Sequence, residues 1–121
     1  MIHISDKCRY LLYNGHADMR KSFHGLAAIV TCKMQHNVLS GDVYIFISKR
    51  RNAIKLLGFE GDGFAIFYKR LEKGTFELPA HDPASGAMVI SDNELIFILK
   101  GIVLKQVKYR LRYPQNRAIC E

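Results

Sequence analysis

Residues 41–76 constrain the fold more than any other part of the chain, because apolar runs alternate there with short polar turns. Residues 43–48 carry apolar side chains on both faces of an extended strand, which predicts a central strand or one that helices cover. Residues 49–52 form a turn into a returning strand at 53–60. The sequence Glu-Gly-Asp-Gly at 60–63 predicts a tight turn into a third strand at 64–70, since Asp and Gly tolerate positive φ.

Weaker patterns on either side complete the expected fold. Residues 9–13 and 75–78 are short β-prone runs, and the latter would extend the meander to a fourth strand. Asp18 is the expected N-cap of a helix whose apolar stripe runs from Met19 to Met34. Ser91 and Glu94 match a capping box, and this second helix should end at Gly101.

Beyond that helix, alternation of Val107, Tyr109 and Leu111 with basic residues predicts another strand, followed by a polar tail at 114–121. These patterns together predict one α+β domain over residues 1–113. Its core would be an antiparallel β-meander sheet of four to six strands with two packed helices. An exposed aromatic edge strand of such a sheet would support a homodimer.

Positive charge is concentrated in two parts of the chain. The net charge is +7, and seven of the 18 basic residues lie within residues 41–76. A second concentration runs from residue 100 to residue 117 and contains no acidic residue. Such clustering favours a phosphate-rich partner, although a charge run is often only a solvated face. The strand directions predict that the cations at 49–51 and 69–73 lie at one end of the sheet.

Sequence patterns for catalysis and metal binding are missing. There is no P-loop, GxSxG or HExxH motif, and the three cysteines and five histidines lack zinc-ligand spacing. Asp18, Asp42 and Asp62 have no spacing that supports a metal-dependent nuclease, and an idle thiol is the simpler interpretation of Cys8 and Cys32. The residues therefore predict a protein that is not an enzyme and needs no cofactor or metal. Without an apolar leader or spanning segment, we expect a cytoplasmic protein that does not enter membranes.

Three segments, at 18–30, 41–76 and 91–102, stand in an order and spacing that resemble a known family. The helix opening DMRK-F-GL and the segment FYKRLEKG-F are similar to the accessory second-reading-frame protein, TnpB, of the IS sixty-six group of bacterial insertion sequences. The family pattern falls on Lys55, Gly61 and Gly63 as well. Residues 57–60 depart from it, because many members carry aromatic residues before the glycine turn.

This resemblance implies an accessory role in transposition beside a separate transposase, with no established catalytic activity. The leading hypothesis is direct, non-catalytic binding to DNA at the element ends. The alternative is a module that docks on the transposase and reaches DNA only through it. The expected phosphate contacts come from the helix start, the meander and the C-terminal basic row: Arg20, Lys21, Lys49, Arg50, Arg51, Lys55, Lys69, Arg70, Lys108, Arg110 and Arg112.

Overall fold

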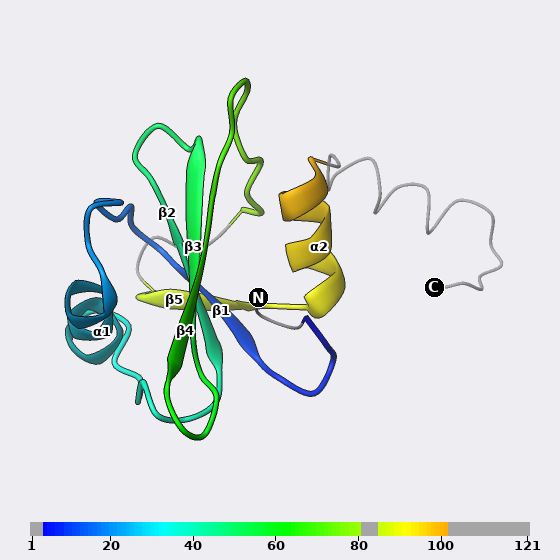
Figure 1. Ribbon diagram of the computed structural model, residues 1–121. Helices are drawn as coiled ribbons and strands as arrows, with labels where there is room; N and C mark the ends of the chain where they lie inside the picture. The colour runs from blue at the N-terminus through cyan, green and yellow to red at the C-terminus, as the bar shows by residue number, and fades with distance from the viewer. Residues whose placement is uncertain (1–3, 81–84, 102–121) are drawn as a thin grey trace, which may run out of the picture.

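A mixed five-stranded sheet with one helix on each face forms the body of the protein (Figure 1). The computed structural model describes residues 4–80 and 85–101. The strand order is β4-β3-β2-β1-β5, so β4 and β5 are the two edges within the described residues. The elements are β1 (Tyr10–Tyr13), α1 (Phe23–Cys32), β2 (Val43–Ile47), β3 (Ala53–Phe59), β4 (Phe64–Arg70), β5 (Ala87–Ile90) and α2 (Asp92–Lys100).

The topology joins a β-α-β unit to a meander. β1 and β2 are parallel, with Leu11 opposite Tyr44, and α1 supplies the crossover that a parallel pair requires. β2, β3 and β4 follow as antiparallel neighbours, and β5 returns antiparallel to β1. The prediction of an α+β fold with two packed helices is confirmed, as is the strand number. The sheet is antiparallel at every pairing but β1–β2.

Two apolar layers hold the helices on the sheet. Tyr44 and Phe46 project from β2 into the layer under α1, where Leu26 and Val30 pack, while Ile45 projects into the layer under α2. All five residues of β2 are buried, which confirms the expectation of a strand covered on both faces. The α2 layer also receives Leu95 and Ile98 of the helix. Burial on both faces makes β2 the centre of the core.

The first helix begins later than the sequence pattern indicates. α1 starts at Phe23 with Ser22 at the N-cap, so the prediction of Asp18 as N-cap was wrong. The Asp18 carboxylate instead accepts the backbone N–H of Arg20, and the Asp18 carbonyl accepts the N–H of Lys21. These local bonds close a turn before the helix, which is the competition with helix formation expected of an aspartate. The second helix is confirmed with its capping box at Ser91 and Glu94 and its left-handed Gly101.

The segment after β4 also differs from the sequence expectation. Residues 75–78 do not form a fourth meander strand. Phe76 instead inserts its side chain into the layer under α2, and its N–H donates to the Arg51 carbonyl at 2.7 Å. The strand β5 was not predicted from the sequence. The expected strand around residues 107–111 and the boundary at 113–114 lie outside the described residues.

In the part of the chain that the structure describes, neither helix is long and apolar enough to cross a membrane.

Candidate nucleic-acid interface

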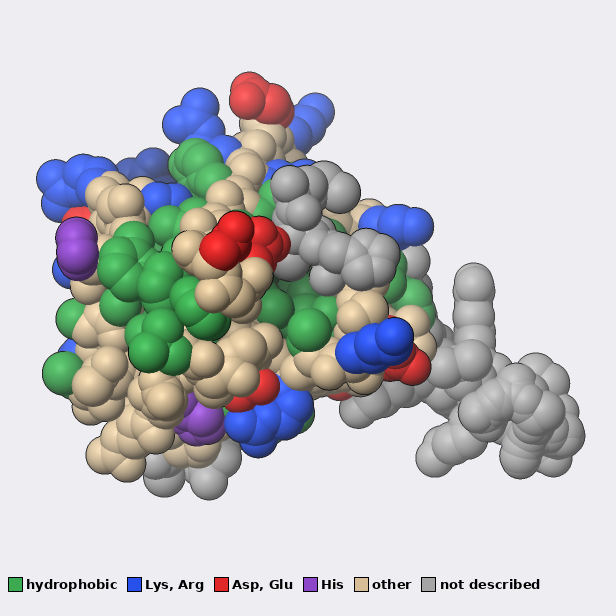
Figure 2. Space-filling model, turned by 60° about the horizontal axis from the view of Figure 1, so that its bottom comes forward, with side chains coloured by type: hydrophobic (Ala, Val, Ile, Leu, Met, Phe, Trp, Pro, Cys, Tyr) green, Lys and Arg blue, Asp and Glu red, His purple; other side chains and the backbone are tan. Residues whose placement is uncertain are grey.

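Three segments that are distant in sequence meet at one end of the sheet, where several strands finish. β1 and β2 are parallel, and β3 runs antiparallel to both β2 and β4. β1, β2 and β4 therefore run in one direction and finish at the same end of the sheet. The loop at 14–22 follows β1, the turn at 48–52 follows β2, and the segment at 69–73 contains the last residues of β4 and those after it. We call this end of the sheet the basic rim; its cations are Arg20, Lys21, Lys49, Arg50, Arg51, Arg70 and Lys73. Figure 2 shows Lys and Arg side chains gathered along the upper edge of the molecule.

The turn between β2 and β3 presents three consecutive cations to solvent. Lys49, Arg50 and Arg51 are all exposed. The Arg51 N–H donates to the Ser48 carbonyl at 2.9 Å, and the Ser48 hydroxyl oxygen accepts the Ala53 N–H at 3.1 Å. These bonds hold the turn in one conformation. The sequence prediction that cations at 49–51 lie beside the end of β4 is confirmed, because Arg70 pairs with Ala53.

Arg51 occupies a backbone conformation that favours glycine, with φ at +61°. A side chain in this left-handed region costs roughly 1–2 kcal/mol, part of which glycine would return as greater freedom in the unfolded chain. We therefore expect Arg51→Gly to raise the free energy of unfolding by up to about 1 kcal/mol. Urea denaturation followed by circular dichroism measures this change. Arg50→Gly, at the preceding turn residue, is the control and should not stabilise the fold; equal effects would contradict the account.

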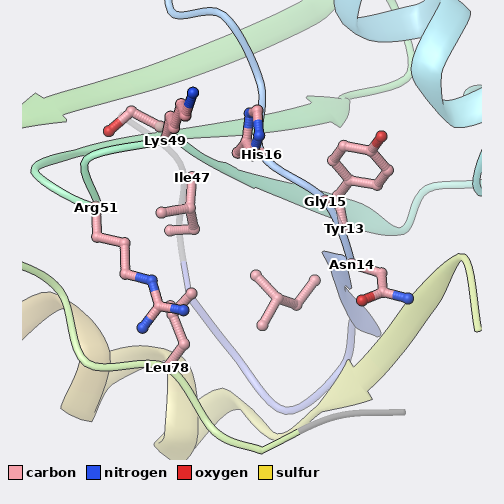
Figure 3. Close-up of a pocket in the computed structure, with 10 residues that line it drawn as sticks. Tyr13, Asn14, Gly15, His16, Ile47, Lys49, Arg51 and Leu78 are labelled. Atoms are coloured by element: carbon pink, nitrogen blue, oxygen red, sulfur yellow. The ribbon is translucent and has the colours of Figure 1, made fainter. Parts of the chain in front are cut away.

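Two hollows adjoin this turn and share His16, Ser48 and Lys49 in their walls. One hollow, of about 240 Å³, lies at the ends of β1 and β2 and includes Arg51 and Leu78 in its lining. The other, of about 390 Å³, lies between the loop at 16–19 and the turn, with Arg50 in its lining. Figure 3 shows Arg51 pointing toward Leu78, with Lys49 and His16 across Ile47 from it. Cations therefore line a concave part of the rim.

His16 is a rim residue that the sequence analysis did not select. It is exposed and lines both hollows. A single histidine after an Asn-Gly turn carries no spacing signal, so only the three-dimensional approach of two loops reveals its position. Lys73 is likewise exposed at the end of the segment after β4.

Arg20 is the rim cation that already has an acidic partner. Its guanidinium Nη2 lies 2.7 Å from Oδ2 of Asp18, and its side chain is 91% exposed. Hydrogen bonds from the Arg20 side chain and backbone, followed by the charges of Arg20 and Lys21, lower the pKa of Asp18 from 3.8 to about 2. The Asp18 carboxylate in turn raises the pKa of Arg20. This pairing offsets part of the charge that Arg20 would offer to a phosphate.

The Asp18 pairing predicts a specific acid titration. A carboxyl group whose pKa is depressed on folding stabilises the fold above its unfolded value of 3.8 and loses that contribution as the pH falls toward about 2. We expect the side-chain carboxyl resonance of Asp18 in NMR spectra to titrate with a midpoint near 2, and to move toward 3.8 in Arg20→Gln. Arg50→Gln is the matched control. A midpoint that is the same in all three proteins would contradict the assignment.

Lys21 and Lys55 are linked to each other rather than fully free. The ammonium of Lys55 donates to the Lys21 carbonyl at 2.7 Å and lies 5.2 Å from the centroid of the Tyr68 ring. Lys55 is half-buried, so it joins β3 to the loop before α1. The side chain of Lys21 stays exposed on the rim, packed along Gly25.

Lys69 lies apart from Arg70, because successive side chains of a strand point to opposite faces. Its ammonium donates to the Leu99 carbonyl at 3.1 Å, at the end of α2. Arg70 points to the α1 face, where the rim continues. Lys108, Arg110 and Arg112 lie outside the described residues. The structure thus brings six of the predicted cations to one rim and places Lys55 and Lys69 in structural contacts; the six are Arg20, Lys21, Lys49, Arg50, Arg51 and Arg70.

The acidic residues considered for catalysis are not brought together. Asp18 lies at the rim. Asp42 precedes β2 and Asp62 precedes β4, so both lie at the opposite end of the sheet. Asp42 is paired with Arg9, with a separation of 2.7 Å. Within residues 4–80 and 85–101, no group of three or more His, Cys, Asp or Glu residues has a metal-binding arrangement. Cys8 and Cys32 are free thiols.

Comparison with known proteins places the chain in a family. Residues 8–109 match the family model described as "IS66 Orf2 like protein". This match covers most of the chain and shows that the chain belongs to the IS66 Orf2-like family of insertion-sequence accessory proteins. This confirms the family resemblance seen in the sequence.

Two similar proteins come from Sinorhizobium fredii (strain NBRC 101917 / NGR234). The chain is 32% identical to "Uncharacterized protein y4hO" over 102 residues, which are 84% of this chain and 87% of that protein. It is 28% identical to "Uncharacterized protein y4jC" over 117 residues, covering 97% of this chain and 96% of that protein. No solved structure matches. The likeness therefore extends over nearly the full length of these relatives.

Proposed function

We propose that this insertion-sequence accessory protein binds DNA directly and without catalysis, through the basic rim. The observation that carries the proposal is the convergence of cations from three separate segments at one end of the sheet. Lys49, Arg50 and Arg51 are exposed and lie beside two hollows, and Arg70 ends the neighbouring strand. Cations arranged in this way neutralise successive phosphates and release their counterions, which is the main source of sequence-independent affinity.

The start of α1 adds a second feature that suits a phosphate. The N-cap Ser22 makes no side-chain capping hydrogen bond, and the first turn has no acidic residue. Free N–H groups and the helix dipole at such an end favour an anion. Lys21 lies directly before it and is exposed. A DNA backbone that follows the rim would therefore meet both side-chain cations and backbone donors.

The proposed biological setting is the bacterial cytoplasm, with the ends of the element as the DNA and the transposase of the same element as a further partner. Family membership supports this setting, because accessory proteins of insertion sequences act in transposition. Phosphate contacts position a protein on DNA without reading its sequence. Recognition of the element ends would then come from the transposase, and the basic rim would add affinity.

A pull-down on purified protein tests the direct interaction. Immobilised duplexes carrying the terminal repeats of the element, and scrambled duplexes of equal length, are incubated with the protein alone and with added transposase. We expect the protein alone to be retained on both duplexes at low salt, and the transposase to increase retention on the terminal repeats. No retention of the protein alone, on either duplex, would contradict direct binding.

The second candidate function is docking on the transposase, with DNA reached only through it. It is favoured by Val89, which is 57% exposed on the edge strand β5 and offers an apolar contact outside the basic segments. This candidate predicts that the protein co-purifies with the transposase after nuclease treatment. It also predicts that Arg50→Ala together with Arg51→Ala leaves co-purification unchanged, whereas direct DNA binding would be weakened.

A further inference from the structure

The edge strand β4 has backbone groups that no described residue pairs. Leu71 donates its N–H to the Asn52 carbonyl, and Glu60 donates to the Gly63 carbonyl. In an antiparallel ladder hydrogen-bonded pairs alternate, so Ala65, Phe67 and Lys69 face β3 with their backbone groups. The N–H and C=O groups of Phe64, Ile66, Tyr68 and Arg70 therefore point away from β3. Among the described residues β4 has β3 as its sole neighbour.

Side chains on this strand are also exposed. Ile66 is 36% and Tyr68 50% exposed, and both lie on the face that carries α1. The strand pairs with β3 in unbroken register from Phe64 to Arg70, and it contains neither a proline nor a bulge. Proteins that keep an edge unpaired commonly interrupt it with such devices. An uninterrupted seven-residue edge with exposed apolar side chains suits strand addition.

The charges around β4 indicate what would pair with it. Asp62 lies in the turn before the strand, and Arg70 ends it. A second β4 laid antiparallel would therefore bring Asp62 of one copy beside Arg70 of the other at both ends. The chain's own sequence from residue 100 to residue 117 has six basic residues and no acidic residue, so it offers no carboxylate to Arg70. Charge complementarity thus favours a second copy of the chain.

We propose that two copies of the chain form a homodimer by pairing their β4 strands antiparallel about a two-fold axis at Ile66. Even-numbered residues carry the outward backbone groups, and in this register every hydrogen-bonded pair between the two strands joins even-numbered residues. Ile66 faces its own copy and Phe64 faces Tyr68 of the second copy, while Asp62, in the turn before β4, comes beside Arg70 at the end of the second β4. Directly opposed aromatic and opposite-charge pairs stabilise antiparallel strands. The two sheets become one continuous sheet, and each copy contributes a basic rim.

Sedimentation equilibrium on the full chain tests the dimer. We expect the 13.8 kDa chain to sediment at twice its mass at micromolar concentration. Asp62→Arg alone, or Arg70→Asp alone, places like charges opposite each other twice per dimer and should weaken dimerisation about ten-fold. The double variant restores opposite charges and should recover the wild-type dissociation constant within about two-fold. Asp6→Arg, at an exposed acidic residue near the N-terminus, is the matched control and should change nothing.

Ile66→Lys provides an independent variant at the centre of the register and should yield a monomer. Circular dichroism and thermal unfolding establish that each variant is folded, so that loss of the dimer can be distinguished from unfolding of the chain. A wild-type chain that is still monomeric at about 100 μM would overturn the proposal, because the expected dimer forms at micromolar concentration. Failure of the double variant to recover, or equal weakening by Asp6→Arg, would overturn it as well.

Discussion

Replacing Lys49 and Arg50 with alanine and Arg51 with glycine is expected to lower the affinity for duplex DNA by roughly two orders of magnitude at low salt. These three cations occupy one turn and line both hollows between them. Glycine at position 51 suits the positive φ of that residue, so the variant should fold at least as well as the natural chain. Fluorescence anisotropy with a labelled duplex measures the loss.

The matched control removes the same charge elsewhere. Lys7, Lys33 and Lys100 are exposed and lie outside the basic rim. Replacing all three with alanine lowers the net charge by the same three units, from +7 to +4. We expect this variant to lose far less affinity than the turn variant. Equal losses would show that total charge, rather than the rim, governs binding.

Phe46→Ala is expected to destabilise the fold by about 3–5 kcal/mol. The Phe46 side chain is fully buried in the layer between β2 and α1, and its ring centroid lies 6.1 Å from that of Tyr13. A domain of this kind has a total free energy of unfolding of about 5–15 kcal/mol, so the loss leaves little margin. Urea denaturation followed by circular dichroism measures it.

Val89→Ala is the matched control for the core variant. Val89 is also a strand residue but is 57% exposed, and its truncation should change the free energy of unfolding by less than about 0.5 kcal/mol. If both variants were equally stable, β2 would not be the centre of the core. If both unfolded, the edge strand β5 would contribute more than its exposure indicates.

Local patterns in the sequence predicted the elements with strong signals. The alternation of apolar runs and turns located β2, β3 and β4, and the capping box located α2. Strand direction then predicted that the turn at 49–51 lies beside the end of β4, and the pairing of Ala53 with Arg70 confirms it. Each of these inferences depends on neighbours in sequence or on the alternation of a meander, which sequence periodicity records directly.

Local sequence patterns could not predict the contacts between segments that are distant in the chain. The parallel pairing of β1 with β2 follows from the crossover of α1, and no local signal distinguishes it from antiparallel pairing. The same limit applies to Lys69, whose contact with Leu99 depends on where α2 packs. His16 reaches the rim because two loops approach each other. Asp18 was misassigned because the turn that it closes with Arg20 and Lys21 does not continue into the helix, which begins at Phe23.

The salt dependence of DNA binding tests the central claim most directly. Each phosphate that the protein neutralises contributes about −0.9 to the slope of log affinity against log salt concentration. The described rim cations without an acidic partner are Lys21, Lys49, Arg50, Arg51, Arg70 and Lys73. If most of them contact phosphates, an anisotropy titration of the purified protein should give a slope of roughly −4 to −5. A protein that fails to bind duplex or single-stranded DNA even at low ionic strength would contradict direct DNA binding by this rim.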